Sequence, residues 1–300
     1  HQYEAMDARI VRGSYRGYEL VGLGLPAAGA VSIQALHVME RFDPDSMDDE
    51  EWSAIAGQAL GMASLELRTL ATDTASARAT SKEWATQVAE RIKTPTHRPP
   101  DDSPLLPALD ARGDDQGHTA HITIADASGM IVALTQTLGP NMGSKVVTPG
   151  LGFLYASTLG GYLGRMEPGQ RASSYISPIM VLKDGEPVLA LGAAGGARIV
   201  SGVVQVISRV IDDGLSLAQA LEAPRVHMNR DGRLDTETSP DIGWTPAQLE
   251  DIRALGIEVT ETPRSGAFSR VHAVHYDRDT GTWYGVADPD WEGSARGPAP

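Results

Sequence analysis

The chain has 300 residues, 41% of them apolar, and a formal net charge of −14 at pH 7. Its acidity opposes nucleic-acid binding, which needs a basic surface, and the absence of cysteine excludes disulfides, thiolate nucleophiles and cysteine-ligated metals. Because there is no run of about 18 apolar residues, no membrane span is expected, and the length suits one substantial globular unit.

The first third of the chain is predicted to form helices followed by a linker. Apolar residues recur at helical spacing over 30–41, 50–70 and 81–92. A Gly-rich stretch over 22–29 departs from the spacing of dinucleotide-binding loops and contains a proline, so it gives little support for a phosphate site. Residues 94–117 are dense in Pro, Asp and Gly without apolar periodicity, which predicts an exposed linker.

The linker leads into a predicted β-hairpin. Residues 119–125 and 130–137 are rich in Ile, Val and Thr, and an Asp-Ala-Ser-Gly turn composition separates them. A register centred near Ser128 places Thr119 opposite Thr137, with Cβ atoms roughly 5 Å apart on one face. This pair is a candidate nucleophile with a hydroxyl partner, although threonines also face each other in sheets for packing and hydrogen bonding alone.

A flexible linker directly before a strand that begins with threonine is what a self-cleaving N-terminal-nucleophile enzyme needs. Cleavage of the His118–Thr119 peptide bond frees an α-amine on Thr119, and that amine acts as general base for the residue's own hydroxyl. In the uncut chain the Thr119 hydroxyl first attacks the His118 carbonyl, and Thr137 orients it for that step. His118 and Thr119 therefore form a candidate processing site.

The remaining strands follow this hairpin. Alternating or β-rich runs predict strands over 179–182, 188–191, 258–262, 271–276 and 282–286. Tight-turn compositions at 184–185 and 277–281 join neighbouring strands into antiparallel pairs rather than repeated β-α-β units. The chain is therefore predicted to have an α+β fold.

A Gly-rich turn after residue 191 leads into a predicted helix over 197–211. The backbone amides of Gly195 and Gly196, at a helix start, suit an anion such as the oxyanion of acyl transfer. A tight strand-to-helix turn that needs positive φ is the alternative interpretation. Arg198 follows, either to neutralise a substrate carboxylate or to anchor the helix to a buried acid such as Asp288, and the structural role is favoured.

Four histidines offer an alternative site. His118 and His121 form one pair, and His272 and His275 form another whose members point to opposite faces of a strand. Neither pair has nearby acidic ligands in a recognised metal spacing. We therefore assign no metal site to them.

These residues resemble a known family, the γ-glutamyltransferases (glutathione hydrolases) of the N-terminal-nucleophile superfamily. The motifs that carry the resemblance fall in family order over nearly the whole chain: Ser14-Tyr15-Arg16-Gly17-Tyr18, the Pro-Gly turn at 26–29, Thr119-Ala120-His121, residues 171–178, Gly195-Gly196-Ala197-Arg198, residues 222–227 and Gly285-Val286-Ala287-Asp288-Pro289. The resemblance implies a four-layer α/β/β/α sandwich with two stacked antiparallel sheets. It also implies a zymogen. Residues 1–118 are then the C-terminal part of the large-subunit region, which ends in the exposed linker, and residues 119–300 are the small-subunit, catalytic region. The two regions together form one structural unit.

The resemblance further implies an amide hydrolase or acyltransferase that needs no metal or organic cofactor. γ-Glutamyl transfer or glutathione hydrolysis is the default activity. Thr119 is then the nucleophile released by autoprocessing, and Thr137 bonds to it. The amides of Gly195 and Gly196 form the oxyanion hole, and Ser174 contacts the substrate carboxylate.

The chain departs from the family in its expected glutamyl pocket. Gly139, Thr158 and Gly161 stand where the family usually has an Asn, a Gln or Glu, and an Asp that hold the α-carboxylate and α-amine. Each lost charge-assisted hydrogen bond typically costs ~1.5–3 kcal/mol, which weakens glutamyl selectivity. Tyr175 takes the place of the second serine of a Ser-Ser pair, unless Ser173 substitutes after a one-residue slip. The segment after Gly161 is too short for the lid of many members, so an acylase or amidase for another acyl group is the alternative.

The expected partners follow from the resemblance. They are a small-molecule amide or γ-glutamyl substrate and the two fragments of the chain's own cleavage, which stay associated as a heterodimer. Family precursors carry a long leader with a substrate-binding arginine, and we expect either a natural short form or a separate polypeptide that supplies this region. A periplasmic or secreted location rests on the resemblance alone. An uncut, non-catalytic relative acting as a binding or structural subunit is the hypothesis from a different class.

Overall fold

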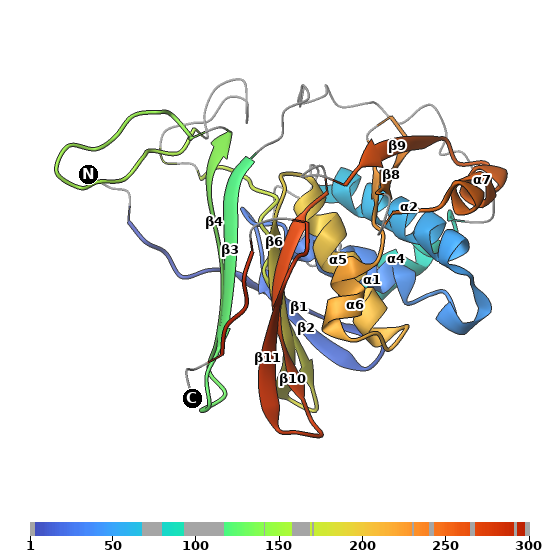
Figure 1. Ribbon diagram of the computed structural model, residues 1–300, viewed down its shortest axis with the longest axis horizontal. Helices are drawn as coiled ribbons and strands as arrows, with labels where there is room; N and C mark the ends of the chain where they lie inside the picture. Colours follow the sequence, from blue (N-terminus) through green and yellow to red (C-terminus); the bar gives the residue numbers. More distant parts are fainter. Residues whose placement is uncertain are drawn as a thin grey trace.

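A six-stranded antiparallel sheet forms the centre of the fold (Figure 1). The computed structural model describes residues 4–67, 80–92, 117–140, 142–157, 169, 171–229, 231–239, 243–264, 268–290 and 293–297. In spatial order the strands of this sheet are β1 (Ile10–Tyr15), β2 (Tyr18–Leu23), β5 (Ile179–Lys183), β6 (Glu186–Ala194), β10 (Arg270–Asp277) and β11 (Thr282–Ala287). Strands from both sides of the predicted cleavage point share this sheet, because Leu20 of β2 pairs with Val181 of β5. The division at residue 118 itself stays a prediction.

Helices cover one face of this sheet (Figure 1). They are α1 (Gly29–Met39), α2 (Asp49–Leu67), α4 (Lys82–Ala89), α5 (Arg198–Ile211) and α6 (Leu217–Glu222), with a short 3₁₀ turn, η1 (Pro44–Ser46), before α2. Every residue of α1 is buried, as expected for a helix that is apolar on most sides. Ser81 caps the start of α4: its side chain accepts the Trp84 N–H and so satisfies one free donor of the first turn. The predicted helices are therefore confirmed, with ends that differ by at most three residues where those ends are described.

A hairpin of β3 (Gly117–Ala125) and β4 (Ile131–Pro140) lies on the other face of the sheet (Figure 1). Its turn is closed by Asp126, whose Oδ1 accepts the N–H groups of Ser128 and Met130 at 2.8 and 3.0 Å. Thr119 and Thr137 are direct partners in the register. The predicted hairpin and its register are thus confirmed.

Side chains alternate across the hairpin, as the strand period requires. His121 and Thr123 face the central sheet, where Thr123 Oγ1 donates to the His272 carbonyl at 3.2 Å. On the outer face, Ile122 and Leu134 form a cross-strand pair, and each is about half exposed (50% and 51%). The outer face is therefore apolar and open to solvent, although burial of apolar surface is the main favourable term in folding.

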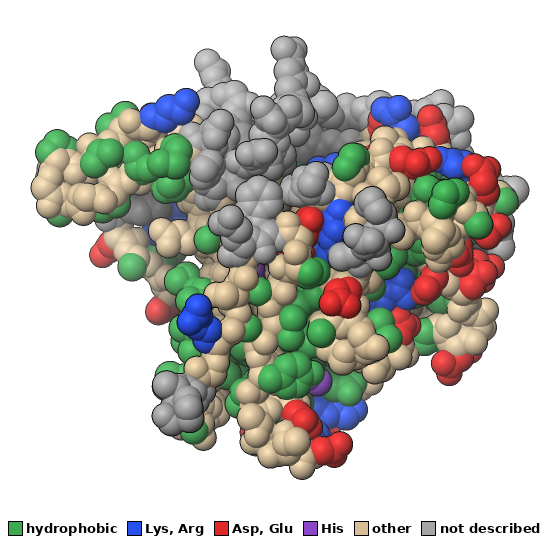
Figure 2. All heavy atoms as spheres, viewed as in Figure 1, with side chains coloured by type: hydrophobic (Ala, Val, Ile, Leu, Met, Phe, Trp, Pro, Cys, Tyr) green, Lys and Arg blue, Asp and Glu red, His purple; other side chains and the backbone are tan. Residues whose placement is uncertain are grey.

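An arm follows β4 and extends away from the central sheet. The Tyr155 N–H donates to the Val146 carbonyl, and the Thr148 N–H donates to the Phe153 carbonyl, so two stretches of the arm run antiparallel. Figure 2 shows hydrophobic side chains gathered on this arm. The exposed ones are Met142, Val146, Val147, Leu151, Phe153 and Tyr155.

A third, smaller sheet carries its own apolar cluster. It contains β7 (Val226–Met228), β8 (Leu234–Thr238) and β9 (Val259–Pro263), and β8 and β9 run parallel across the connecting α7 (Pro246–Ala254). α7 begins with a capping box in which Thr245 and Gln248 bind each other's backbone N–H, with Pro246 at the first helical position. Of this sheet only β9 was predicted, because β7 has three residues and β8 has a single apolar residue among its five.

The predicted α+β sandwich is confirmed. Two stacked antiparallel sheets are present, with the helices packed on the larger one. The prediction missed the β1–β2 hairpin and the parallel β8–β9 pair. Among the described residues, no helix combines the length and apolar character needed to cross a bilayer.

Candidate active site

Thr119 and Thr137 join their hydroxyl groups at one end of the hairpin. Thr119 Oγ1 donates to Thr137 Oγ1 at 2.9 Å, and the Gly139 N–H donates to the same Thr137 oxygen at 3.0 Å. Thr137 therefore accepts two hydrogen bonds, one of which fixes the direction of the Thr119 hydroxyl. A positioned hydroxyl near the start of β3 is the geometry that the sequence predicted for the nucleophile. Nothing of the His118 side chain lies within the described part of the structure.

His121 forms hydrogen bonds with both strands of the hairpin. Its Nδ1 and Nε2 lie 2.8 Å from Thr135 Oγ1 and Thr123 Oγ1, respectively. The Thr123 hydroxyl gives its proton to the His272 carbonyl, so Nε2 must carry the hydrogen and Nδ1 must accept from Thr135. Burial, with a smaller electrostatic contribution from His272, lowers the pKa of His121 to about 4. The ring is therefore neutral at neutral pH and serves as a fixed hydrogen-bond bridge.

This neutral histidine gives a pH-dependent stability. Because its pKa falls from 6.5 unfolded to about 4 folded, its contribution is present above pH 6.5 and is lost as pH falls toward 4. The pKa values of His37 and His227 are lowered to about 4 and about 3, in both cases chiefly by burial. Urea unfolding should show a free energy lower by roughly 2–3 kcal/mol per histidine at pH 4.5 than at pH 7.

In the variant His121→Gln, the free energy of unfolding is expected to fall less between pH 7 and pH 4.5, by the contribution of one histidine. The comparison variant is His275→Gln: burial also lowers the pKa of His275, but by less than that of His121, so this variant should flatten the dependence less. An unchanged slope in the first variant would show that His121 is not neutral in the folded chain.

The Gly195–Gly196 turn lies between β6 and α5. Both glycines have positive φ, +141° and +57°, and the carbonyls of Gly195 and Gly196 accept the N–H groups of Arg198 and Ile199. N–H groups at a helix start lack acceptors within the helix, and the helix dipole adds partial positive charge there. The turn therefore has the backbone geometry and polarity that suit an anion. The alternative interpretation, a tight turn whose positive φ values require glycine, is also consistent with this geometry.

The fold brings these two elements to the same end of the sandwich. The His121 ring packs directly on Gly192 of β6, where an added Cβ would lie 2.4 Å from the ring. From this contact, Thr119 lies two residues toward the start of β3 and Gly195 three residues toward the end of β6. Figure 1 shows the start of β3, the end of β4 and the start of α5 at one end of the molecule. The hydroxyl pair and the glycine turn are thus on the same side of the fold.

The predicted substrate serines approach this end from β5. Ile179 pairs with Leu191, so residues just before β5 lie toward the end of β6. Ser174 is fixed by its N–H, which donates to the Pro26 carbonyl at 2.8 Å, and its Oγ accepts the Ile176 N–H at 3.3 Å.

The neighbours of Ser174 differ in exposure. Ser173 is exposed, whereas Tyr175 is partly buried against the main core. Of the two candidates for a second polar contact, Ser173 is therefore the more accessible.

The expected glutamyl pocket is only partly described. Gly139 has φ of +82°, and an added Cβ would lie 2.6 Å from the Ser157 carbonyl oxygen. A side chain at this position would therefore require the Ser157 backbone to move. Thr158 and Gly161 lie outside the described residues.

Arg198 has a structural partner other than the one predicted. Its guanidinium Nη2 binds Asp235 Oδ2 at 2.5 Å, and Asn229 donates to the other oxygen of this carboxylate. The structural role was favoured from the sequence, but the predicted acid, Asp288, was wrong. Asp235 lies on β8, whose presence the sequence pattern did not reveal. Among the described residues, no group of three or more His, Asp or Glu side chains is placed to bind a metal ion.

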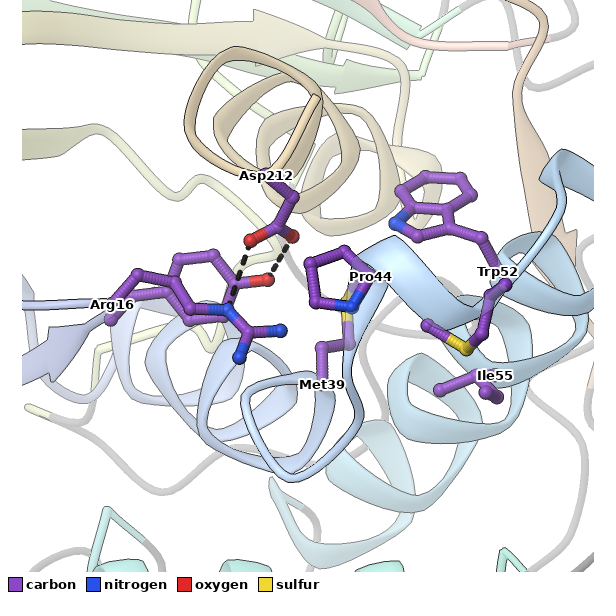
Figure 3. Close-up of a pocket in the computed structure, with 8 residues that line it drawn as sticks. Arg16, Met39, Pro44, Trp52, Ile55 and Asp212 are labelled. Atoms are coloured by element: carbon purple, nitrogen blue, oxygen red, sulfur yellow. Dashed lines mark hydrogen bonds and ion pairs between the residues drawn. The ribbon is translucent and has the colours of Figure 1, made fainter. Parts of the chain in front are cut away.

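A small pocket elsewhere involves the first resemblance motif (Figure 3). Asp212 accepts hydrogen bonds from the Tyr15 hydroxyl and from Arg16 Nε, the latter at 3.0 Å, beside Trp52. Burial and the negative charge of Asp212 raise the pKa of Tyr15. The pocket has a volume of about 10 Å³, room for about one water molecule. This motif therefore ties the β1–β2 turn to the end of α5.

Sequence reasoning missed residues that support the glycine turn. Ser269 packs against Gly195, and its carbonyl accepts a hydrogen bond from buried Arg225. Arg225 stands within one resemblance motif, but its contact with Ser269 joins positions 44 residues apart. No local pattern in the sequence predicts such a pair.

Comparison with known proteins places these features in context. The sequence model of the family described as Gamma-glutamyltranspeptidase matches residues 1–297. The Acylase ACY 1 proenzyme of Pseudomonas sp. (strain SE83) is 31% identical over 292 residues, which cover 92% of this chain and 50% of that protein. The Glutathione hydrolase proenzyme of Escherichia coli (strain K12) is 28% identical over 316 residues, covering 96% and 52%. The chain spans about half the length of these curated relatives.

A solved structure supports the fold. The cephalosporin acylase from Bacillus halodurans superposes with a TM-score of 0.79 over 98% of this chain and 54% of that chain, at 21% identity. The similarity of fold therefore covers nearly the whole chain.

Proposed function

The chain belongs to the gamma-glutamyltranspeptidase family, and we propose that it is an amide hydrolase or acyltransferase whose nucleophile is Thr119, freed by cleavage of the His118–Thr119 bond. The observation that carries this proposal is the 2.9 Å bond between Thr119 Oγ1 and Thr137 Oγ1, at the end of the sandwich where the Gly195–Gly196 turn lies. Two relatives are named proenzymes, which supports processing of a precursor.

The processing step is an acyl shift followed by hydrolysis. Thr119 Oγ1 attacks the His118 carbonyl carbon, the peptide C–N bond breaks, and the threonine nitrogen takes a proton to become an amine. The result is an ester between His118 and the Thr119 oxygen. Water hydrolyses this ester, leaving a carboxylate on His118 and a free hydroxyl and α-amine on Thr119. Thr137 supports the first step because its oxygen orients the attacking hydroxyl.

The catalytic cycle uses the freed amine as general base. The amine takes the Thr119 hydroxyl proton as the oxygen attacks the substrate amide, and it returns a proton to the leaving amine. The N–H groups of Gly195 and Gly196 stabilise the oxyanion of each tetrahedral intermediate. Water then releases the acyl group as an acid, or an amine acceptor takes it in transfer. No metal or organic cofactor enters these steps.

The acyl group is γ-glutamyl in the default form of this proposal, with Ser174 and Ser173 near its carboxylate. A second candidate is acylase activity on a different acyl group. The observation that favours it is Gly139, where a substrate-binding side chain would require the Ser157 backbone to move. One relative is itself named an acylase.

Hydrolysis of paired anilides separates these two candidates. A γ-glutamyl anilide and neutral acyl anilides of similar length are compared by kcat/KM in the full-length protein, with Thr119→Ala as the blank. A kcat/KM that is more than about 100-fold higher for the glutamyl compound supports γ-glutamyl specificity. Such a ratio corresponds to about 2.8 kcal/mol of selective binding, because each tenfold corresponds to roughly 1.4 kcal/mol. Comparable rates support the acylase. Cleaved protein that hydrolyses neither class contradicts the proposal.

A further polypeptide region is proposed to cover the exposed apolar surfaces. The outer face of the β3–β4 hairpin presents Ile122, Ile124, Val132 and Leu134, and the arm over 142–155 adds a second apolar surface. A two-stranded hairpin is marginally stable alone and needs a covered apolar face. The remaining half of the relatives' length, as a part of the same protein or as a separate chain, is the proposed cover, and the two cleavage fragments stay together through the shared central sheet.

A further inference from the structure

A buried cluster of four charged side chains reaches the Gly195–Gly196 turn through Ser269. Its members are Arg225, Glu237, Arg264 and Asp288, each at most 4% exposed. Arg264 Nη1 lies 3.3 Å from Glu237, and Arg264 Nη2 lies 3.4 Å from Asp288. Burial of ions carries a large desolvation cost, and apolar replacements of similar volume are often at least as stable. Fold stability alone therefore gives no reason for such a cluster at this place.

Arg225 connects the cluster to the backbone at two separate positions and pairs with a second member of the cluster. Its Nη1 donates to the Ser269 carbonyl at 2.5 Å, and its Nη2 donates to the Leu221 carbonyl at 2.8 Å. Nη2 also lies 2.7 Å from Asp288 Oδ2. The fork of the guanidinium is thus fixed on both arms, and a planar, preorganised cation of this kind holds its partners at defined positions.

Asp288 in turn fixes the start of β10, directly after Ser269. Its Oδ2 accepts the Val271 N–H at 3.1 Å, and its own N–H donates to the Val271 carbonyl at 3.0 Å. Burial alone would raise the pKa of Asp288, but Arg225 and the backbone donors outweigh it, so the pKa is lowered and the side chain stays charged. By contrast, burial raises the pKa of Glu237 to about 7. Asp288 is therefore the constant counter-ion of Arg225.

Ser269 forms the wall against which Gly195 packs. An added Cβ on Gly195 would lie 2.7 Å from Ser269 Cα, and the next residue, Arg270, pairs with Ala194 at the end of β6. Among the described residues, the Ser269 hydroxyl has no hydrogen-bond partner, although the residue is only 1% exposed. The Ser269 backbone, more than its side chain, therefore sets the place of the turn.

We propose that Arg225 is a positioning residue for the oxyanion turn: held by Asp288, it fixes the Ser269 carbonyl, and the Ser269 backbone holds Gly195 and Gly196 in place. This inference rests on the proposed role of the two glycine amides. Oxyanion donors act only when they are held at the correct distance, and a shift of about 1 Å costs as much as 10²-fold in rate. Arg225 acts on the reaction through this geometry without touching the substrate.

The test compares two buried arginines in the full-length protein. Arg225→Lys keeps the positive charge beside Asp288, but one ammonium group does not reproduce the fork that joins Ser269 and Leu221. We expect kcat for an anilide substrate to fall about 10- to 100-fold while KM changes less than about threefold, because oxyanion contacts form in the transition state. The matched control is Arg209→Lys, since Arg209 is 5% exposed and pairs with Asp49 and Asp213, away from the turn.

Thermal midpoints of both variants separate positioning from stability. The proposal is overturned if Arg225→Lys keeps its kcat, or if both variants lose kcat in proportion to their lowered midpoints. If Arg225→Lys does not fold, Asp288→Asn decides: it retains an acceptor for Val271, removes the counter-ion and should lower kcat in the same way, whereas unchanged kcat overturns the proposal. Normal kcat in these variants, combined with an inactive Thr119→Ala, rejects the positioning role while the proposed function stands.

Discussion

Replacing Thr119 with Ala is expected to leave residues 1–300 as one uncut chain and to lower amide hydrolysis by at least about 10³-fold, since removal of a nucleophile costs this much in comparable enzymes. The variant lacks the oxygen that attacks the His118 carbonyl and the oxygen that carries the acyl group. Denaturing electrophoresis measures the cut, and anilide hydrolysis measures the activity. Both losses have one cause, because a single side-chain oxygen performs both reactions.

Two control variants make this result specific. Thr119→Ser keeps a hydroxyl at the same atom position and should still be cut and active, at a lower rate. Thr123→Ala removes another hydroxyl from the same face of β3, the one that bonds His121 and the His272 carbonyl, and should still be cut. Cleavage at His118–Thr119 that persists in Thr119→Ala would show that an external protease makes the cut.

Replacing Gly195 with Ala is expected to lower kcat by about 10²- to 10³-fold, the usual effect of losing an oxyanion donor. The added Cβ would lie 2.7 Å from Ser269 Cα, so either the turn or the start of β10 must move. In addition, φ of +141° is a conformation that side chains rarely adopt. Single-turnover and steady-state kinetics should show the loss in kcat with little change in KM.

The control for backbone strain alone is Gly185→Ala. Gly185 also has positive φ, +82°, on the β5–β6 turn, but an added Cβ there meets no atom within 4 Å. This variant should lose about 1 kcal/mol of stability and keep its kcat. Equal kinetic losses in both variants would assign the effect to strain and would remove the support for an oxyanion role of Gly195.

The elements that the sequence predicted are those governed by local rules. The β3–β4 hairpin followed from alternating β-branched residues and from the Asp126 turn, so its register followed as well. The β1–β2 hairpin was missed because its turn uses Arg16 with φ of +50° before Gly17, and charged residues rarely signal such a turn. The parallel β8–β9 pair was missed although β9 was predicted, because β8 has a single apolar residue among its five and its pairing across the intervening α7 is not set by local sequence.

The candidate site divides in the same way. Thr119, Thr137 and the glycine turn were predicted as site elements from strand register and from a glycine pair before a helix, and their role in the reaction stays a prediction. The supports of the turn were not found, because the Arg225–Asp288 pair joins positions far apart in the chain and its partner choice depends on the tertiary fold. Arg198 illustrates the same limit, since its role was predicted but its acid partner was not.

The most direct measurement is the intact mass of freshly purified protein, followed over time in the presence of protease inhibitors, with N-terminal sequencing of any fragment. A threonine nucleophile released by its own chain predicts two fragments, 1–118 and 119–300, the second beginning at Thr119 with a free amine. Conversion should proceed at a rate that does not depend on protein concentration, because the step occurs within one molecule. A chain that stays whole while hydrolysing amides, or a fragment that begins at another residue, would contradict this account.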